Sequence, residues 1–322
     1  MMTDDQQTLL TIFSAPKPFR GHIDLIQRNA IDSWLALGDQ VEVFLVGDEE
    51  GIAEITAETG IRHIQNVERN KQGTPLISSI FELARDAALS PLLCYINADV
   101  ILLDDFLPTI RWVYDTLRSF LIVGQRWDLN VNERVFFRDG GATALRNRVT
   151  LDGRLHSPAG SDYFVFPRDL LTQIPPFALG RAGWDNWMIY AGRAAQVPVI
   201  DATERITIIH QDHDYNHLPD GEPHYHLPES QENVLMGGGK VTKFNLRQCS
   251  HRLEKDRLML NRPRNISDLQ RWMDAASVLR FGPGKVAKAI RMLVHPIQTA
   301  RYLLRPRKPS GNNEDKRLDT SA

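Results

Sequence analysis

The sequence is poor in cysteine, with only Cys94 and Cys249 in 322 residues. Two thiols cannot form a disulfide scaffold, and so few are typical of a protein from a reducing compartment. There is also no run of 18 or more apolar residues, so no membrane-spanning helix is predicted. The first residues, MMTDDQQ, are acidic and polar, and no basic flank precedes the apolar residues that follow. We therefore expect a cytoplasmic protein.

The net charge is small, −2, but it is unevenly distributed. Residues 285–308 contain seven Lys or Arg and no acid. Because residues 309–322 contribute −1, residues 1–284 carry −8. The chain as a whole is therefore not expected to bind polyanions, although its C-terminal segment is basic. Hydrophobic residues make up 42% and charged residues 24%, which excludes wholesale disorder.

The first 130 residues alternate between short apolar runs and segments with helical spacing of apolar residues. We predict strands at 8–13, 41–46, 61–64, 92–96 and 120–123, and helices at 22–37, 52–58, 76–89 and 104–117. Strands separated by helices of this length form βαβ units. The pattern therefore predicts an α/β fold with a parallel sheet and helices on both faces.

The pattern changes in the second half of the chain. Residues 128–160 and 211–245 show no clear periodicity and are predicted to be loops. Further strands are predicted at 163–166, 197–200 and 206–209, and helix from 268 to 304. We expect one α/β domain at 1–260, a basic helical extension at 261–308 and a disordered tail at 309–322.

Ligands of open α/β sheets bind beyond the carboxyl ends of the strands. Asp99 follows the predicted strand at 92–96 and precedes the apolar residues 100–102. A carboxylate between two apolar segments is costly to keep ionised unless it is paired or binds a metal ion. Asp99 could also be an ordinary turn or cap carboxylate.

The segment YINADVIL at 95–102 resembles the D-x-D element of GT-A fold glycosyltransferases, with Asn97 in place of the first acid. Five segments, in the same order along the chain, are similar to a little-studied bacterial and plant set of these proteins. They are SAPKPF, FLVGDEEG, GSDYFVFP, GRAGWDNW and IIHQDHDY. The resemblance covers residues 8–215. It implies a Rossmann-like mixed sheet and a nucleotide-sugar donor, with UDP the most frequent nucleotide of the family. It also implies Mn²⁺ or Mg²⁺ held by Asp99.

The resemblance also implies which residues surround the nucleotide. They are Phe13, Ser14, Ala15, Pro16, Arg20, Asp48, Lys71, Ser78, Asn97 and Asp99. Basic side chains can neutralise the charge that develops on a diphosphate leaving group. Lys17, Arg20 and Lys71 are the basic residues nearest the predicted strand ends, and each could equally be an ordinary surface charge.

The segment at 180–187, GRAGWDNW, places Asp185 between Trp184 and Trp187. By the same resemblance Asp185 is the general base that takes the proton of the acceptor hydroxyl. The two tryptophans could support a sugar ring, or they could be core residues below a capping aspartate. Gly160, Ser161 and Asp162 are implied to border the donor sugar and the acceptor, and could instead form a simple turn.

Five histidines fall between 210 and 226. The resemblance implies His210 as a further metal ligand, with His213 as the second choice, and leaves His217, His224 and His226 as loop residues. The same cluster, with Asp212 and Asp214, could hold Zn²⁺ in a hydrolase. Two further alternatives are a sugar nucleotidyltransferase and a non-catalytic nucleotide-sugar-binding protein.

The basic C-terminal segment, 285–308, has apolar residues at helical spacing between its cations. An amphipathic basic helix can lie on an anionic membrane surface. Such contact, at the inner face of the membrane, would suit a glycan or lipid-linked acceptor. The alternative is two helices packed on the acidic body with solvated charges. We expect no nucleic-acid partner.

Overall fold

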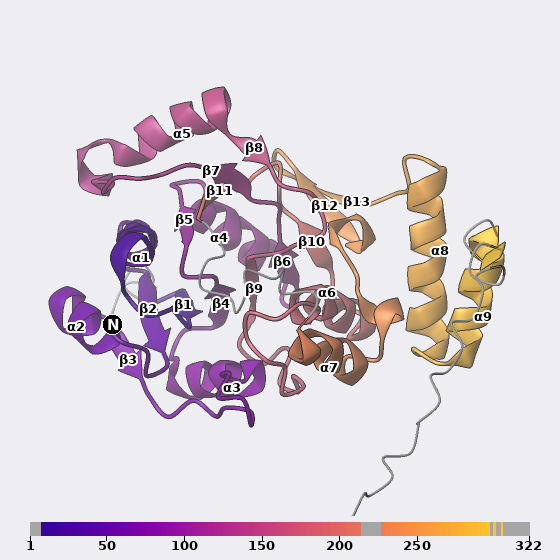
Figure 1. Ribbon diagram of the computed structural model, residues 1–322. Coiled ribbons are helices and arrows are strands. Elements are labelled where there is room, and N and C mark those ends of the chain that lie inside the picture. Colours follow the sequence, from indigo (N-terminus) through magenta and orange to yellow (C-terminus); the bar gives the residue numbers. More distant parts are fainter. Residues whose placement is uncertain (1–7, 214–226, 297–298, 301–303, 305–322) are drawn as a thin grey trace, which may run out of the picture.

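The computed structural model describes residues 8–213, 227–296, 299–300 and 304 (Figure 1). Within these residues nine strands form one sheet, in the order β13-β12-β10-β6-β9-β4-β1-β2-β3. The strands are β1 (Leu10–Ser14), β2 (Val41–Val46), β3 (Arg62–Ile64), β4 (Leu92–Ile96), β6 (Leu121–Val123), β9 (Tyr163–Pro167), β10 (Val199–Asp201), β12 (His251–Glu254) and β13 (Arg257–Leu260).

The sheet is mixed. β1 pairs in parallel with β2 and β4, and β2 in parallel with β3. β9 is antiparallel to both β4 and β6, so β4 and β6 run in the same direction. β10 is parallel to β6 and to β12, and only β13 closes the edge as an antiparallel strand. The carboxyl ends of β1, β2, β4, β6, β10 and β12 therefore lie at one edge of the sheet.

A second sheet of four strands, in the order β5-β11-β7-β8, lies beyond that edge. It contains β5 (Val100–Leu102), β7 (Trp127–Leu129), β8 (Arg154–Leu155) and β11 (Ile208–Gln211). β5 follows β4 after three residues, and β11 is antiparallel to β5. This pairing brings the end of β11 to the end of β4, although more than 100 residues separate them in the sequence.

Helices cover both faces of the main sheet, as predicted. On one face α1 (Gly21–Leu35), α2 (Ile52–Thr59) and α4 (Phe106–Thr116) pack against one core cluster. On the other face α3 (Ile77–Ala87) and α6 (Trp184–Ala194) pack against a second. Side chains of a strand alternate between the two faces. In β4, Leu92, Cys94 and Ile96 accordingly belong to the first cluster, and Leu93 and Tyr95 to the second.

The elements predicted in the first 123 residues are confirmed, each within two residues at either end. The loop prediction for 128–160 is wrong, because this region contains β8 and α5 (Gly141–Asp152). The inward side of α5 is narrow and contains only Leu145 and Val149 as buried residues, so its apolar periodicity is weak. The loop prediction for 211–245 is also wrong in part, because α7 (Pro228–Met236) lies within it. Residues 214–226 lie outside the described part.

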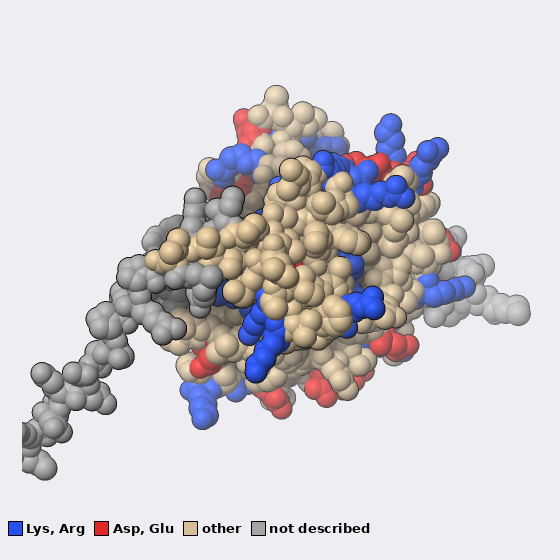
Figure 2. All heavy atoms as spheres, turned by 90° about the vertical axis from the view of Figure 1, so that its right-hand side faces the viewer, with Lys and Arg blue, Asp and Glu red and all other residues tan. Residues whose placement is uncertain are grey.

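Two helices follow the sheet, α8 (Ile266–Phe281) and α9 (Lys285–Val294). Ala275 of α8 belongs to the second core cluster, and α9 packs on α8, where His295 Nε2 lies 2.8 Å from Asp274 Oδ2. Figure 2 shows the outer face of this pair as a broad, largely uncharged area with Lys and Arg side chains at its edges. Among the described helices, none is both long enough and apolar enough to cross a membrane.

Candidate metal and nucleotide site

Asp99 lies in the short turn that joins β4 to β5. The turn is closed by a hydrogen bond from Val100 N to Asn97 O, 3.1 Å long. Val100 to Leu102 are fully buried, and they anchor the turn from below. The Asp99 side chain is only 13% exposed. Its Oδ1 atom is buried and has no hydrogen-bond partner in the described residues.

Two histidines from the end of β11 face the other oxygen of Asp99. His213 Nε2 lies 3.1 Å from Asp99 Oδ2, and His210 Nε2 lies 3.9 Å from the same atom. One ligand atom from each of the three residues can be chosen so that all lie within 4.8 Å of one another. The structure thus brings together the three residues that the sequence analysis named as metal ligands.

The electrostatics of this group keep the Asp99 carboxylate ionised. Burial alone would raise the pKa of the Asp99 carboxyl, but His210, His213 and Lys17 outweigh burial and hold that pKa well below its usual range. Burial lowers the pKa of His210, which favours the neutral imidazole that binds metals. The Lys17 ammonium lies 3.9 Å from Asp99 Oδ2. Among the three basic residues considered from the sequence, Lys17 is therefore the one beside Asp99.

The donor set fits a divalent cation. A carboxylate oxygen and imidazole nitrogens are ligands that Mn²⁺ accepts, and Mg²⁺ prefers the oxygen donors of such a set. The buried, unpartnered Asp99 Oδ1 supplies one unused donor atom. The side chains of the trio, 13%, 11% and 4% exposed, leave little water to compete.

Beside this trio lies a network of charged groups around Arg126. Arg126 Nη1 donates to both carboxylate oxygens of Asp162, at 2.9 and 2.8 Å. Arg126 Nε donates to Asp128 Oδ1 at 2.9 Å. The Asn97 amide donates to Asp162 Oδ1 at 2.8 Å, so the network reaches the turn that holds Asp99. The two acids hold the pKa of Arg126 above its usual range despite burial.

The sequence analysis missed Arg126 and Asp128. Both follow strand β6 in the segment Gln125–Asp128, so the rule that selected Asp99 would also have selected them. Asp128 Oδ1 lies 3.6 Å from His210 Nδ1, and Asp128 Oδ2 lies 2.9 Å from His156 Nδ1. Asp128, His210 and Asp212 form a second group with metal-ligand spacing that shares His210 with the first.

The residues expected around the nucleotide are distributed along the same edge. The Ser14 hydroxyl donates to Ile96 O at 2.6 Å and fastens the end of β1 to the end of β4. Phe13 is fully buried, with its ring 5.0 Å from that of Phe81, so its side chain lies in the core. Pro16 is buried and Ala15 half-buried.

The remaining nucleotide residues lie nearer the surface. Arg20 is exposed and forms an ion pair with Glu50, close in sequence to the exposed Asp48. Lys71 is exposed in the turn before α3, and Ser78 is half-buried in the first turn of α3. Nothing in the geometry assigns these side chains to a phosphate or a base, and their nucleotide role stays a prediction.

Asp185 lies in the first turn of α6. Gly183 precedes the helix with φ of 107°, a left-handed conformation that a side chain would strain, which explains a glycine at this position. Burial raises the pKa of the Asp185 carboxyl, and the nearby Asp162 raises it further. A half-buried carboxyl with a raised pKa is suited to accept a proton near neutral pH.

The two tryptophans of this helix take different positions. Trp184 is 6% exposed and packs edge-on against Tyr95, with ring centroids 5.1 Å apart, so it belongs to the core beneath the site. Trp187 is half-buried and packs on Phe177 at 5.2 Å. Ser161 is buried with its hydroxyl unpartnered in the described residues, next to the half-buried Gly160. His217, His224, His226 and Asp214 lie outside the described residues.

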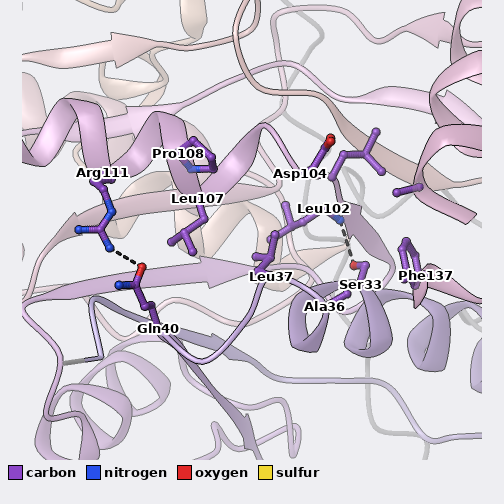
Figure 3. A pocket seen from close by; sticks show the side chains of 12 residues that line it. Ser33, Ala36, Leu37, Gln40, Leu102, Asp104, Leu107, Pro108, Arg111 and Phe137 are labelled. Carbon is purple, nitrogen blue, oxygen red and sulfur yellow. Dashed lines mark hydrogen bonds between the residues drawn. The ribbon is translucent and has the colours of Figure 1, made fainter. Parts of the chain in front are cut away.

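A separate hollow of about 430 Å³ lies between α1 and α4 (Figure 3). Leu37, Leu102 and Leu107 point into it, and Arg111 donates to Gln40 at one end. None of the site residues named from the sequence is among the described residues that line it.

No protein-family profile and no curated protein matches this sequence. Solved structures are similar in fold. A crystal structure of S. aureus TarS in complex with UDP-GlcNAc is 11% identical, with 90% of this chain and 87% of that chain covered and a TM-score of 0.49. A crystal structure of M. tuberculosis glucosyl-3-phosphoglycerate synthase in complex with Mg²⁺ and UDP is 16% identical, with 65% and 73% covered and a TM-score of 0.39. The chain itself has the mixed α/β architecture, with an Asn-Ala-Asp turn after β4, that the sequence resemblance to the GT-A fold predicts.

Proposed function

We propose that this protein is a metal-dependent glycosyltransferase of the GT-A type. It moves a sugar from a nucleotide diphosphate sugar, with UDP the nucleotide expected from the sequence resemblance, to an acceptor hydroxyl. The observation that carries the proposal is the convergence of Asp99, His210 and His213 at the carboxyl edge of the sheet, with Asp99 Oδ1 buried and unpartnered in the described residues. A carboxylate at the surface is solvated by water and would need neither the two histidines nor a buried position.

Asp99, His210 and His213 would hold Mn²⁺ or Mg²⁺. When bound, the cation supplies positive charge that neutralises the diphosphate of the donor. In the transfer, the acceptor oxygen forms a bond to the anomeric carbon, and the bond from that carbon to the diphosphate breaks. The nucleoside diphosphate leaves with the electron pair. Asp185 accepts the acceptor proton if the reaction inverts the anomeric centre, and its half-buried carboxyl and raised pKa support this role.

The three alternatives differ in what they need. A zinc hydrolase is less well supported, since Asp99, His210 and His213 lie at the edge of the sheet where the nucleotide is predicted to bind. A nucleotidyltransferase needs a glycine-rich loop after β1, and the segment there, SAPKPFRGH, has one glycine. A non-catalytic binding protein would bind the nucleotide sugar without turning it over. Donor turnover therefore separates this last alternative from the transferase.

The deciding experiment is a panel of nucleotide sugars scored for Mn²⁺-dependent hydrolysis. We expect one donor to be hydrolysed by the wild type and a loss of at least about 100-fold in Asp99→Ala. Asp139→Ala, which removes an exposed carboxylate of the short helical turn before α5, is the matched control and keeps full activity. Equal rates in Asp99→Ala and the wild type would overturn the metal assignment, and turnover of no donor would favour the binding protein.

The C-terminal helices support an acceptor held at a membrane. Half of the large hydrophobic side chains that are exposed in the described residues lie between Ile266 and Leu304. Leu293 and Val286 of α9 are 80% and 53% exposed, and the same helix carries Lys285, Lys288 and Arg291. Exposed apolar side chains among cations can bind an anionic lipid surface. We place the protein in the cytoplasm, with this face against the inner side of the membrane and a glycan or lipid-linked acceptor.

A further inference from the structure

A pocket of about 470 Å³ opens at the carboxyl edge of the main sheet. It is lined by the residues that follow β6 and β10, by β12, by the segment 261–265 and by the first two turns of α8. β6, β10 and β12 run in the same direction as β4, so this pocket and Asp99 lie at the same edge of the sheet. Pockets of this volume hold ligands of the size of a small sugar derivative.

The pocket shares a wall with the candidate site. Gln125 lines the pocket, and the next residue, Arg126, holds Asp162 in the site. Pro158 also lines the pocket, and Asn186, beside Asp185, donates to Ala159 O at 2.8 Å. The pocket therefore borders two segments whose neighbouring residues make contacts in the candidate site.

Four arginines line the pocket, and their partners differ. Arg247 forms an ion pair with Asp268 at 3.1 Å, and Arg252 forms one with Glu254. Arg264 reaches Glu254 only at 3.7 Å, and Arg262 makes no ion pair in the described part of the chain. The guanidinium of Arg262 is therefore available to an anion, and Glu254 holds that of Arg264 only through a long contact. Guanidinium groups bind phosphate and carboxylate through paired hydrogen bonds.

Two of the three acids in the lining already have partners. Asp268 is already paired with Arg247. Asp201 accepts hydrogen bonds from Thr203 N and Oγ1, and burial raises the pKa of its carboxyl. Glu204 is exposed.

An aromatic surface completes the pocket. Trp272 of α8 lines it, and its side chain is 51% exposed. An exposed indole is uncommon on a helix that packs against a core, and its face can cover the apolar side of a sugar ring. The pocket thus combines the exposed guanidinium groups of Arg262 and Arg264 with an aromatic face.

We propose that this pocket binds the acceptor, and that the acceptor is a sugar that carries a phosphate or carboxylate group. This inference rests on the proposed glycosyltransferase function and names the substrate class of that site. Arg262 and Arg264 bind the anionic group, and Trp272 supports the ring.

The test is calorimetric titration of the full-length protein with glucose 6-phosphate, glucuronate and glucose, with and without UDP and Mn²⁺. We expect at least one of the two anionic sugars to bind about tenfold more tightly than glucose. The double variant Arg262→Ala/Arg264→Ala loses this preference. The matched control Arg118→Ala, an exposed arginine just before β6 at the opposite edge of the sheet, keeps it. A preference for only one anionic sugar shows whether the pocket recognises a phosphate or a carboxylate group.

Equal binding of all three sugars would overturn the inference, as would an unchanged preference in the double variant or an equal loss in the control. Titration of UDP with Mn²⁺ in the same samples separates this inference from the proposed function. If the wild type and the double variant bind UDP equally and neither prefers an anionic sugar, the acceptor pocket is rejected and the proposed function is not. A sugar preference without Mn²⁺-dependent UDP binding rejects the transferase and leaves the pocket.

Discussion

The side-chain amide of Asn97 donates a 2.8 Å hydrogen bond to Asp162 Oδ1 across 65 residues of sequence. Asn97 stands where the D-x-D element has its first acid, and this contact supplies a physical reason for the difference. A carboxylate at position 97 would face the carboxylate of Asp162 at hydrogen-bond distance. Like charges so close cannot both stay ionised without cost. An amide at this position can donate, whereas a carboxylate cannot.

Asn97→Asp is therefore expected to destabilise the fold. The change replaces a donor by a second acceptor in a half-buried place, and we expect a loss of about 1–3 kcal/mol in the free energy of unfolding. Urea denaturation at pH 7 measures this loss. Asn130→Asp, at an exposed site, is the matched control. Asn70→Asp is unsuitable as a control because the Asn70 amide donates to Glu229. An Asn97→Asp protein as stable as Asn130→Asp would contradict this explanation.

Much of the fold could be predicted because the first half has strong local patterns. Strands β1, β2 and β4 are apolar runs with sharp ends, and the helices between them have regular apolar spacing. The rule that ligands lie beyond strand ends then selected Asp99. His210 and His213 came from the resemblance, and β11 pairing with β5 explains why they reach Asp99.

Other parts could not be predicted because they depend on distant contacts. Three strands of the second sheet, β5, β7 and β8, are two or three residues long, too short for a periodic pattern; β11 alone was predicted, at 206–209. β12 has charged residues at alternate positions, Arg252 and Glu254, and neither it nor the edge strand β13 was predicted. Arg126 and Asp128 follow β6 and the strand-end rule could have selected them, but their pairing with Asp162 and His156 depends on contacts that the sequence does not show.

His210→Ala and His213→Ala should both weaken Mn²⁺ binding. Each removes one nitrogen from a set of three donors, and we expect a loss in affinity of about 10–100-fold, as found when metal-site ligands or their supports are changed. Titration calorimetry of Mn²⁺ in the presence of UDP measures it. His251→Ala, on β12 and bonded to Ser250 and not to the site, is the matched control. Unchanged Mn²⁺ affinity in both site variants would reject the trio as the cation site.

Arg126→Met should destabilise the protein strongly. The substitution leaves Asp162 and Asp128 without their shared cation, and breaking a buried ion pair by removing one partner costs about 3–5 kcal/mol. The triple variant Arg126→Met/Asp128→Asn/Asp162→Asn removes the orphaned charges as well. It should recover part of the lost stability in thermal denaturation. A single variant with wild-type stability would show that the network does not support the fold.

Val286→Glu/Leu293→Glu should release the protein from anionic liposomes. Both side chains are exposed on α9, so the change alters its outer face without opening the core. We expect the co-sedimented fraction to fall several-fold with vesicles that contain phosphatidylserine, and no binding to neutral vesicles. Truncation after Arg280 should act in the same direction. The matched variant Leu89→Glu/Leu151→Glu, two exposed leucines elsewhere, should co-sediment like the wild type. Equal binding of all variants would mean that α9 lies on the body with solvated charges.

Asp185→Asn should abolish transfer and yet stabilise the fold. The base must be deprotonated to act. Since burial and Asp162 raise the pKa of this carboxyl, the rate should rise with pH through a midpoint above the ordinary aspartate value.

A raised pKa in the folded state means that the folded protein binds the proton more tightly than the unfolded chain does. Stability therefore falls as pH rises from the unfolded pKa to the folded one. Asparagine removes this cost, so the variant should melt higher than the wild type at pH 7, with a rate lower by about 10²–10⁴-fold and unchanged affinity for UDP with Mn²⁺. A variant that keeps its activity would remove Asp185 from the mechanism. A lower melting temperature at pH 7 would show that the carboxylate stabilises the start of α6, as a helix cap does.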